Sequence, residues 1–161
     1  MTDQMTLIEA LTTRVELLED RLAITNLLTK YGPSVDSGSA DAVANMWLED
    51  GVYDIDSGAM HGRDELRAMV RGAAHQNLIL NGSAHMMTPA HIVIDGDRAV
   101  ATGHSQLVIT DPENPSAFKV LRITANRWEL IKTAGEWKVQ RRVGHVLDGS
   151  AEAREILAAG V

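Results

Sequence analysis

The sequence contains no cysteine among its 161 residues. This absence excludes disulfide bonds, a thiol nucleophile and zinc sites that use cysteine ligands. A chain without cysteine also fits a reducing compartment, and we expect a cytoplasmic location. Aromatic residues make up only 4% of the chain, while seven methionines are available to fill irregular apolar space.

Long apolar runs and an excess of positive charge are missing as well. No apolar stretch approaches the ~20 residues that a membrane-spanning helix needs. The acidic start, MTDQMTLIEA, lacks the basic and then apolar pattern of a signal peptide. The formal net charge of -7 at pH 7 argues against nucleic-acid binding. We therefore expect neither a membrane nor a nucleic acid as a partner.

Signature motifs of several large enzyme classes are absent. The sequence has no glycine-rich phosphate loop, no Gly-x-Ser-x-Gly elbow and no basic and aromatic platform for single strands. None of its six histidines has a spacing typical of metal ligands. We expect no metal and no cofactor. The length, with 45% hydrophobic and 23% charged residues, is ordinary for one globular domain over residues 1–161.

Helical periodicity marks the beginning of the sequence. Residues 5–31 predict one long helix with an apolar stripe of Leu11, Val15, Leu18 and Leu22. The stripe is short for a coiled coil, so it indicates a globular packing face, and the first part of the helix is expected to project toward a partner subunit. Proline at position 33 is predicted to end or kink the helix, because it lacks an amide donor.

The rest of the chain predicts short helices and then long strands. Helices are expected at 40–48, capped by Ser39, at 63–75 and at 150–159, capped by Ser150. A strand at 52–55 and a return at 58–62 are followed by extended stretches at 84–95, 98–110, 117–131 and 136–147. Asp-Gly and proline-rich turns separate these stretches. The order predicts an α+β fold in which N-terminal helices pack on a strongly curved antiparallel sheet.

Three polar residues are candidates for chemistry. Tyr31 and Asp36 flank the Gly-Pro break, and His85 begins the first long strand. A carboxylate beside a histidine fixes the imidazole tautomer and stabilises the imidazolium, which makes a general base near neutral pH. The same residues would equally serve as a helix-end plug, a turn cap and a strand-end histidine. Sequence spacing alone leaves both interpretations open.

Two further features bear on a pocket. Ser105 and Leu107 share one strand face with a glycine, which leaves room for a ligand or allows the sheet to bend. Near the end of the last strand, alternation from Trp137 groups Arg141 with the apolar residues and Arg142 with the opposite face. One of these two arginines is expected to enter the pocket and bind a developing anion, unless both are surface cations.

Taken in order, these pieces resemble the SnoaL-like branch of the nuclear-transport-factor-2-like superfamily. The matching pieces are Tyr31 with Asp36 five residues later, then WLEDGVYD, HGRDEL, His85, IDGDRAVATG, and NRWEL with GEWKV. The tyrosine, aspartate and histidine set is similar to that of dehydratase and dehydrochlorinase members, such as bile-acid 7α-dehydratase, scytalone dehydratase and hexachlorocyclohexane dehydrochlorinase. Dehydrochlorinases carry lysine where this chain has Tyr31, whereas Arg142 matches their pattern.

The resemblance implies a cone-shaped α+β barrel and a cofactor-independent lyase. In it, His85 would be the base, Asp36 its orienting partner, and Tyr31 and Arg142 would stabilise the departing oxygen or an enolate. The expected substrate is a bulky, mostly apolar hydroxylated molecule of steroid, terpenoid or polyphenol type. We expect its pocket to be lined by Trp47, Tyr53, Met87, Ser105 and Leu107.

Two rival functions remain open at the level of sequence. The first is an isomerase or cyclase that uses the same base without losing a leaving group. The second is a noncatalytic binding or assembly domain, like the small subunits of ring-hydroxylating oxygenases. The family resemblance also implies a homodimer or homotrimer, because the outer sheet face of such folds is usually covered by another subunit.

Overall fold

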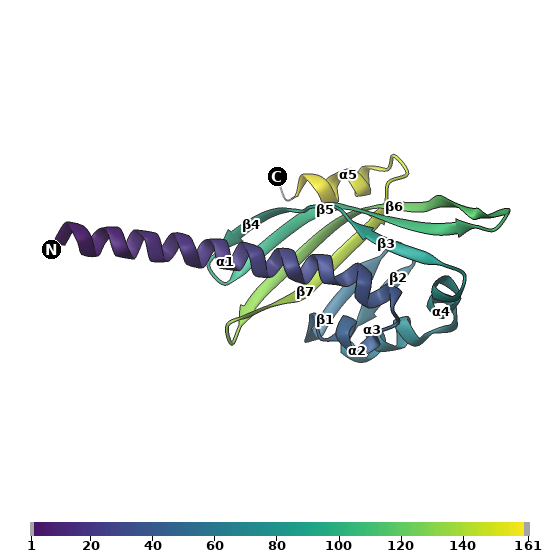
Figure 1. Ribbon diagram of the computed structural model, residues 1–161, viewed down its shortest axis with the longest axis horizontal. Coiled ribbons are helices and arrows are strands. Elements are labelled where there is room, and N and C mark those ends of the chain that lie inside the picture. Colours follow the sequence, from purple (N-terminus) through teal and green to yellow (C-terminus); the bar gives the residue numbers. More distant parts are fainter. Residues whose placement is uncertain (1, 160–161) are drawn as a thin grey trace.

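The computed structural model describes residues 2–159, which form a curved sheet with helices on both sides (Figure 1). The helices are α1 (Thr2–Asp36), α2 (Ala40–Ala44), α3 (Gly62–Arg71), α4 (Ala73–Leu80) and α5 (Ala151–Ala158). The strands are β1 (Trp47–Ile55), β2 (Gly58–His61), β3 (Ser83–Met87), β4 (His91–Asp95), β5 (Arg98–Asp111), β6 (Asn114–Thr133) and β7 (Glu136–Val146). The predicted α+β class is confirmed.

The sheet is antiparallel from β3 to β7, as the long strands and short turns predicted. Its strand order is β2-β1-β7-β6-β5-β3, and β4 also pairs with β5. The pairing of β1 with β7 is parallel and was not predicted. The predicted stretch 84–95 is divided into β3 and β4 around Pro89, because proline cannot donate to the strand ladder.

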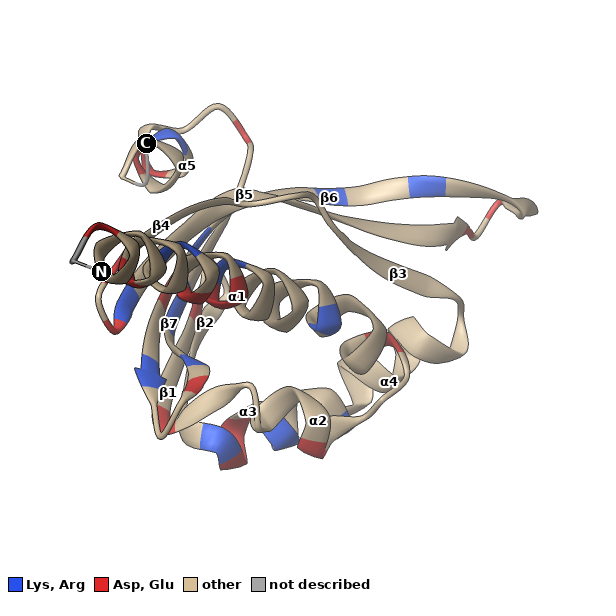
Figure 2. Ribbon diagram, turned by 60° about the vertical axis from the view of Figure 1, so that its left-hand side comes forward, with Lys and Arg blue, Asp and Glu red and all other residues tan. Residues whose placement is uncertain are grey.

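The helices occupy two different faces of the sheet. Helices α1 to α4 lie on its concave side, and α5 lies on the outer face, where it contacts β5, β6 and β7 (Figures 1 and 2). The Ser150 hydroxyl accepts a hydrogen bond from the Ala153 amide at 3.4 Å, so Ser150 caps α5 as predicted. The N-terminal half of α1 extends beyond the sheet (Figure 1).

The core lies between the second half of α1 and the concave face of the sheet. Its largest buried side chains include Trp47 and Trp128, which pack around Tyr31 with ring centroids 6.1 and 5.8 Å away. Ile24 and Val35 of α1 are also fully buried. Burial of these apolar side chains fixes the docked half of α1 against the sheet. Within residues 2–159, no helix has the length and apolar character to span a membrane.

The predicted end of the first helix at Gly32-Pro33 is wrong. Helix α1 continues through Pro33 to Asp36, and the Ser37 amide donates to the Pro33 carbonyl at 3.1 Å. Proline removes one amide donor, and glycine at position 32 has no Cβ to clash with the proline ring, which eliminates part of the usual cost of proline in a helix. The helix therefore carries Asp36 one full turn further than expected.

Two other helix boundaries also differ from the predictions. Helix α2 ends at Ala44, and Trp47 begins β1 instead of ending the helix. The Ser39 side chain makes no capping bond; its hydroxyl instead contacts the Ser37 hydroxyl at 2.9 Å. The predicted helix 63–75 is interrupted at Gly72, and α4 beyond it was missed. Short elements whose ends depend on tertiary contacts are poorly marked in the sequence.

One acidic residue attaches α1 to the sheet. The Asp20 carboxylate accepts a hydrogen bond from the Trp137 indole at 2.9 Å and contacts the Lys132 ammonium at 2.7 Å. The hydrogen bond from Lys132 lowers the pKa of Asp20 below its usual value of 3.8. The ionised carboxylate is therefore favoured by the fold.

Replacing Asp20 with asparagine should lower the midpoint of thermal unfolding at pH 7 by a few degrees. Because the folded pKa of Asp20 is depressed, its contribution is complete above the unfolded pKa of about 4 and is lost as the pH falls through the folded pKa. The difference between wild type and D20N should therefore vanish in acid, which a series of melting curves would test. A constant difference at every pH would contradict this role.

Candidate active site

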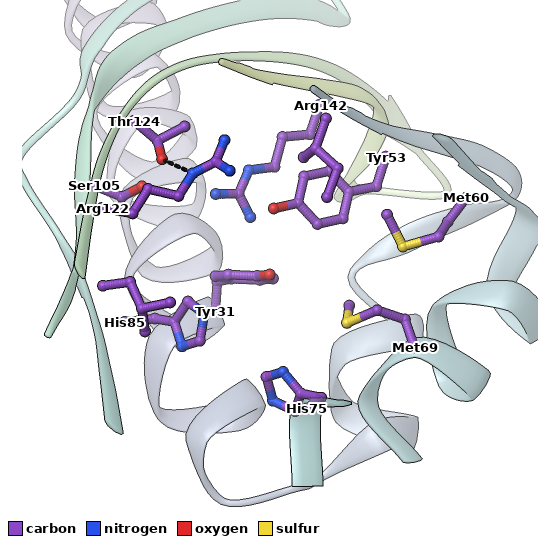
Figure 3. Close-up of a pocket in the computed structure, with 12 residues that line it drawn as sticks. Tyr31, Tyr53, Met60, Met69, His75, His85, Ser105, Arg122, Thr124 and Arg142 are labelled. Carbon is purple, nitrogen blue, oxygen red and sulfur yellow. Dashed lines mark hydrogen bonds between the residues drawn. The ribbon is translucent and has the colours of Figure 1, made fainter. Parts of the chain in front are cut away.

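A cavity of about 190 Å³ lies in the concave side of the sheet, beside the last turns of α1 (Figure 3). Its wall combines apolar and polar side chains in similar numbers. The lining residues are Tyr31, Tyr53, Ile55, Met60, Met69, His75, His85, Ser105, Leu107, Arg122, Thr124 and Arg142. Four of these, Tyr31, His85, Ser105 and Arg142, come from elements far apart in the sequence.

The Asp36 carboxylate is bound to His85 by two hydrogen bonds. One carboxylate oxygen lies 2.6 Å from His85 Nδ1, and the other accepts the His85 backbone amide at 2.7 Å. An ionised carboxylate only accepts hydrogen bonds, so Nδ1 carries the proton and the neutral ring has an unprotonated Nε2. Both side chains are about one-fifth exposed, at 19% and 22%. The carboxylate therefore fixes both the tautomer and the orientation of the His85 ring.

The close approach of α1 and β3 makes this contact possible. Gly32 lies directly against the His85 carbonyl, at a point where a Cβ atom would collide with that oxygen. The glycine before Pro33 thus both keeps the helix continuous and lets β3 lie next to it. Asp36, one turn later, then reaches the amide and the ring of His85.

Tyr31 lies at the floor of the cavity. Its ring stands edge-on to the rings of His85 and Tyr53, with centroids 6.2 and 6.3 Å away. Burial raises the pKa of the Tyr31 hydroxyl well above its usual value of 10.0, and the neighbouring Tyr53 raises it further, while Arg142 opposes the shift. The hydroxyl therefore stays protonated and can act as a hydrogen-bond donor.

Arg142 is a buried cation enclosed by aromatic rings. Its side chain is 3% exposed, and the guanidinium carbon lies 4.3 Å from the Tyr31 ring, 4.5 Å from Tyr53 and 4.2 Å from Trp128. Nε and Nη2 donate to Asn126 Oδ1 at 3.1 and 2.7 Å. Nη1 is buried without a hydrogen-bond partner among the described residues. Arg142 is nonetheless one of the residues that line the cavity (Figure 3).

The strand face predicted for the two arginines is reversed. Gln140 is skipped where Val139 pairs with Leu130 and Arg141 pairs with Glu129, so a bulge shifts the alternation by one residue. Arg142 therefore shares the inner face with Val139, and Arg141 points outward to Asp54 at 2.5 Å. The expectation that one of the pair enters the pocket holds for Arg142.

A second arginine lines the cavity but has a counter-ion. Arg122 Nη2 donates to Asp56 at 2.6 Å, and Nε donates to the Thr124 hydroxyl at 2.8 Å (Figure 3). Its charge is therefore compensated within the protein, whereas Arg142 has no acidic partner in the part of the chain that the structure describes. Among residues 2–159, no three acidic or histidine side chains lie together in a way that could hold a metal ion.

Of the five residues that were expected to line a pocket, three line this cavity. Tyr53, Ser105 and Leu107 line the cavity, and Ser105 accepts a hydrogen bond from Asn126 at 2.9 Å. Trp47 does not line it, because as the first residue of β1 it is fully buried behind Tyr31. Met87 packs against the hydrophobic core, two residues beyond His85 on the same face of β3.

Several lining residues were missed in the sequence. His75 is buried in α4, with Nε2 2.9 Å from the Val35 carbonyl and its ring 5.7 Å from that of His85. Met69 shares the apolar helix face of Leu66 and Val70, which was a usable signal. Asn126 does not line the cavity but accepts two hydrogen bonds from Arg142, and no role was predicted for it because this contact depends on the bulge in the neighbouring strand.

The cavity enclosed by a curved sheet and a long helix defines the cone-shaped fold of nuclear-transport-factor-2-like proteins. The SnoaL-like domain family matches residues 16–143, and the chain belongs to this family. A solved nuclear-transport-factor-2-like protein with a cystatin-like fold from Novosphingobium aromaticivorans is 38% identical. It aligns with a TM-score of 0.88 over 91% of this chain and 94% of that one.

More distant structures share the fold. A protein of unknown function from Mycobacterium tuberculosis is 22% identical, with a TM-score of 0.73 over 90% of each chain. A hexachlorocyclohexane dehydrochlorinase from Novosphingobium barchaimii is 17% identical, with a TM-score of 0.71 over 83% of this chain and 90% of that one. A comparison with curated proteins finds no match.

Replacing Gly32 with alanine should destabilise the protein, although alanine is the better helix former. The propensity gain is about 0.5–1 kcal/mol, whereas forcing a methyl group into a packed contact costs about 1–3 kcal/mol. We expect a net loss of about 1–2 kcal/mol in urea unfolding. Exposed Lys30→Ala in the same turn is the control and should be nearly neutral. A G32A protein as stable as wild type would show that β3 moves freely.

Proposed function

We propose that the protein is a cofactor-independent lyase that removes water from a hydroxylated small molecule. The observation that carries this proposal is the 2.6 Å contact between Asp36 and His85 Nδ1 at the wall of the cavity. A base held in one tautomer, with its free nitrogen toward a pocket, suits abstraction of a carbon-bound proton. The remaining site residues suit stabilisation of the charge that this step creates.

In the proposed reaction, His85 Nε2 takes a proton from the carbon next to a carbonyl group. The electron pair of the broken C–H bond moves toward the carbonyl oxygen as an enolate and then forms the carbon–carbon double bond as the hydroxyl leaves. The proton held on His85 returns to the departing hydroxyl, so one water leaves and the enzyme regains its starting state. Asp36 stabilises the imidazolium between the two proton transfers.

Tyr31 and Arg142 are proposed to stabilise the developing oxyanion. The Tyr31 hydroxyl is protonated because burial raises its pKa, and Arg142 offers a buried N–H group without a partner among the described residues. Donors fixed in a site with little water act strongly on a charge that appears only during the reaction. Both lie within the same aromatic cluster, so their positions are set before the substrate binds.

The volume and polarity of the cavity limit the size and chemical class of the expected substrate. Its volume of about 190 Å³ is below the ~300–1,000 Å³ that is usual for drug-sized ligands. The polar groups in its wall also favour a substrate with more than one oxygen. We therefore propose a compact hydroxylated ketone or phenolic compound with one or two rings. A rigid steroid nucleus would have to extend out of the cavity.

A panel of one- and two-ring β-hydroxy ketones tests the reaction. Mass spectrometry of the products should reveal loss of one water, and His85→Ala should lower turnover by ~10²–10⁴-fold. Asp36→Asn should also lower it, because the neutral amide no longer stabilises the imidazolium. His91→Ala, on β4 and outside the cavity lining, is the matched control and should retain full activity. Full activity in H85A would refute the proposal.

The same panel separates the other reactions that this base could perform. A product of unchanged mass would indicate isomerisation or cyclisation in place of elimination. Binding of panel members without any H85A-sensitive turnover would indicate a noncatalytic ligand-binding domain.

Replacing Arg142 with methionine should separate activity from stability. Turnover should fall by ~10²–10³-fold, as for loss of one oxyanion donor. Thermal stability should change little, because removing a buried charge that lacks a carboxylate partner among the described residues offsets the loss of the two hydrogen bonds to Asn126. Circular dichroism melting and single-turnover rates give the two values. A large fall in melting temperature would mean that Arg142 mainly holds the aromatic cluster together.

A further inference from the structure

The N-terminal half of α1 carries an apolar stripe that covers nothing in the described part of the chain. The side chains of Ile8, Leu11, Val15, Leu18 and Leu22 are 51%, 50%, 52%, 64% and 61% exposed. Their spacing is three, four, three and four residues, which is the heptad pattern of a coiled-coil seam. Past Leu22, the same line along the helix continues with the polar residues Thr25 and Thr29.

The stripe points away from the body of the protein. Each helical residue advances by about 100°, and the stripe is centred roughly 150° from the line of Ile24, Leu28, Tyr31 and Val35, which are buried against the sheet. No bending of the helix toward its own domain would bury both faces. Figure 1 shows this half of α1 extending free of the sheet. The stripe is therefore suited to a surface outside the chain.

We propose that this stripe is the seam of a parallel two-stranded coiled coil with α1 of a second copy. In heptad terms, Ile8, Val15 and Leu22 occupy position a, and Leu11 and Leu18 occupy position d. Two of the three a positions, Ile8 and Val15, are β-branched and both d positions are leucine, a combination that favours two parallel strands. The inference does not rest on the proposed enzymatic activity. It extends the expectation from the sequence that the first part of the helix projects toward a partner subunit, and it replaces the interpretation of the stripe as a globular packing face.

Charges beside the seam favour a second copy in the parallel direction. Arg14 occupies position g and Glu19 the following position e, and both are exposed. In a parallel pair, Arg14 of each chain faces Glu19 of the other, so the two-fold symmetry gives two attractive contacts. In an antiparallel pair, g faces g, and Arg14 would meet Arg21 of the other chain. The charges beside the seam therefore attract each other in the parallel orientation and repel each other in the antiparallel one.

The length of the seam is modest. Residues 8–22 span roughly 22 Å of helix, about four turns. An isolated helix of this size is marginal in water, but here its C-terminal continuation is held in the folded core. The folded domain removes part of the entropy cost of ordering the helix, so a short seam is sufficient for association.

Single cysteines test the direction and face of the pairing. The chain has no cysteine of its own, so Leu11→Cys and Leu18→Cys each give one thiol on the proposed seam. In the parallel register, each thiol faces its own copy within disulfide range, and oxidation should give a species of twice the 17.5 kDa chain mass for both variants. Leu17→Cys, 46% exposed on the opposite side of the helix, is the control and should not crosslink under the same oxidation.

Each other outcome contradicts the proposal. Crosslinking of only one of the two seam variants would indicate an antiparallel pair, in which only a residue near the two-fold axis meets itself. Equal crosslinking of L17C, or none in any variant, would show that the stripe is not a seam. Matching melting curves for the three reduced variants would show that each one is folded.

Charge reversal in the L18C background gives a second test. R14E should reduce crosslinking, because the introduced carboxylate would then face Glu19 of the other chain, and R14E combined with E19R should restore it. An antiparallel pair would respond in the opposite way, since R14E would relieve the contact with Arg21. No response to R14E, or stronger crosslinking, would overturn the parallel register.

Discussion

The hydrogen bonds between Asp36 and His85 connect the last turn of α1 to strand β3, and the geometry of the cavity depends on them. One carboxylate oxygen accepts a hydrogen bond from the His85 amide and the other from the His85 ring, so strand β3 and the side chain are held by the same group. That arrangement requires the helix to pass Pro33 without a break and Gly32 to leave room for the β3 backbone. A single dipeptide thus determines whether Asp36 can reach His85.

The parts of the fold that follow from local periodicity could be predicted. The long antiparallel strands, the cap of α5 and the layout of helices before sheet were readable because period-two alternation and turn residues are local signals. The pairing of His85 with Asp36 was suggested by the family resemblance, since 49 residues separate them and no local rule joins them. Of the end or kink predicted at Pro33, the end is wrong, and glycine at position 32 lessens the usual steric conflict because it has no Cβ.

Other parts of the site depend on contacts that leave no mark in the sequence. A skipped residue between Val139 and Arg141 reverses which arginine faces inward, and strict alternation cannot anticipate a bulge. Asn126 matters because it accepts two bonds from the arginine on the next strand. His75 is brought to the cavity by a helix that follows an unpredicted break at Gly72. Such features arise from packing between distant segments.

The parallel pairing of β1 with β7 has a consequence for the order of folding. Val52 pairs with Arg141, so the first strand of the chain finds this sheet partner only in the last one. Closing a loop of this length is slow relative to local hairpins, and contacts of high sequence separation lower folding rates. During synthesis, β1 and its hairpin with β2 would emerge long before β7. The wall of the cavity that holds Arg142 is therefore complete only after the segment through β7 has left the ribosome.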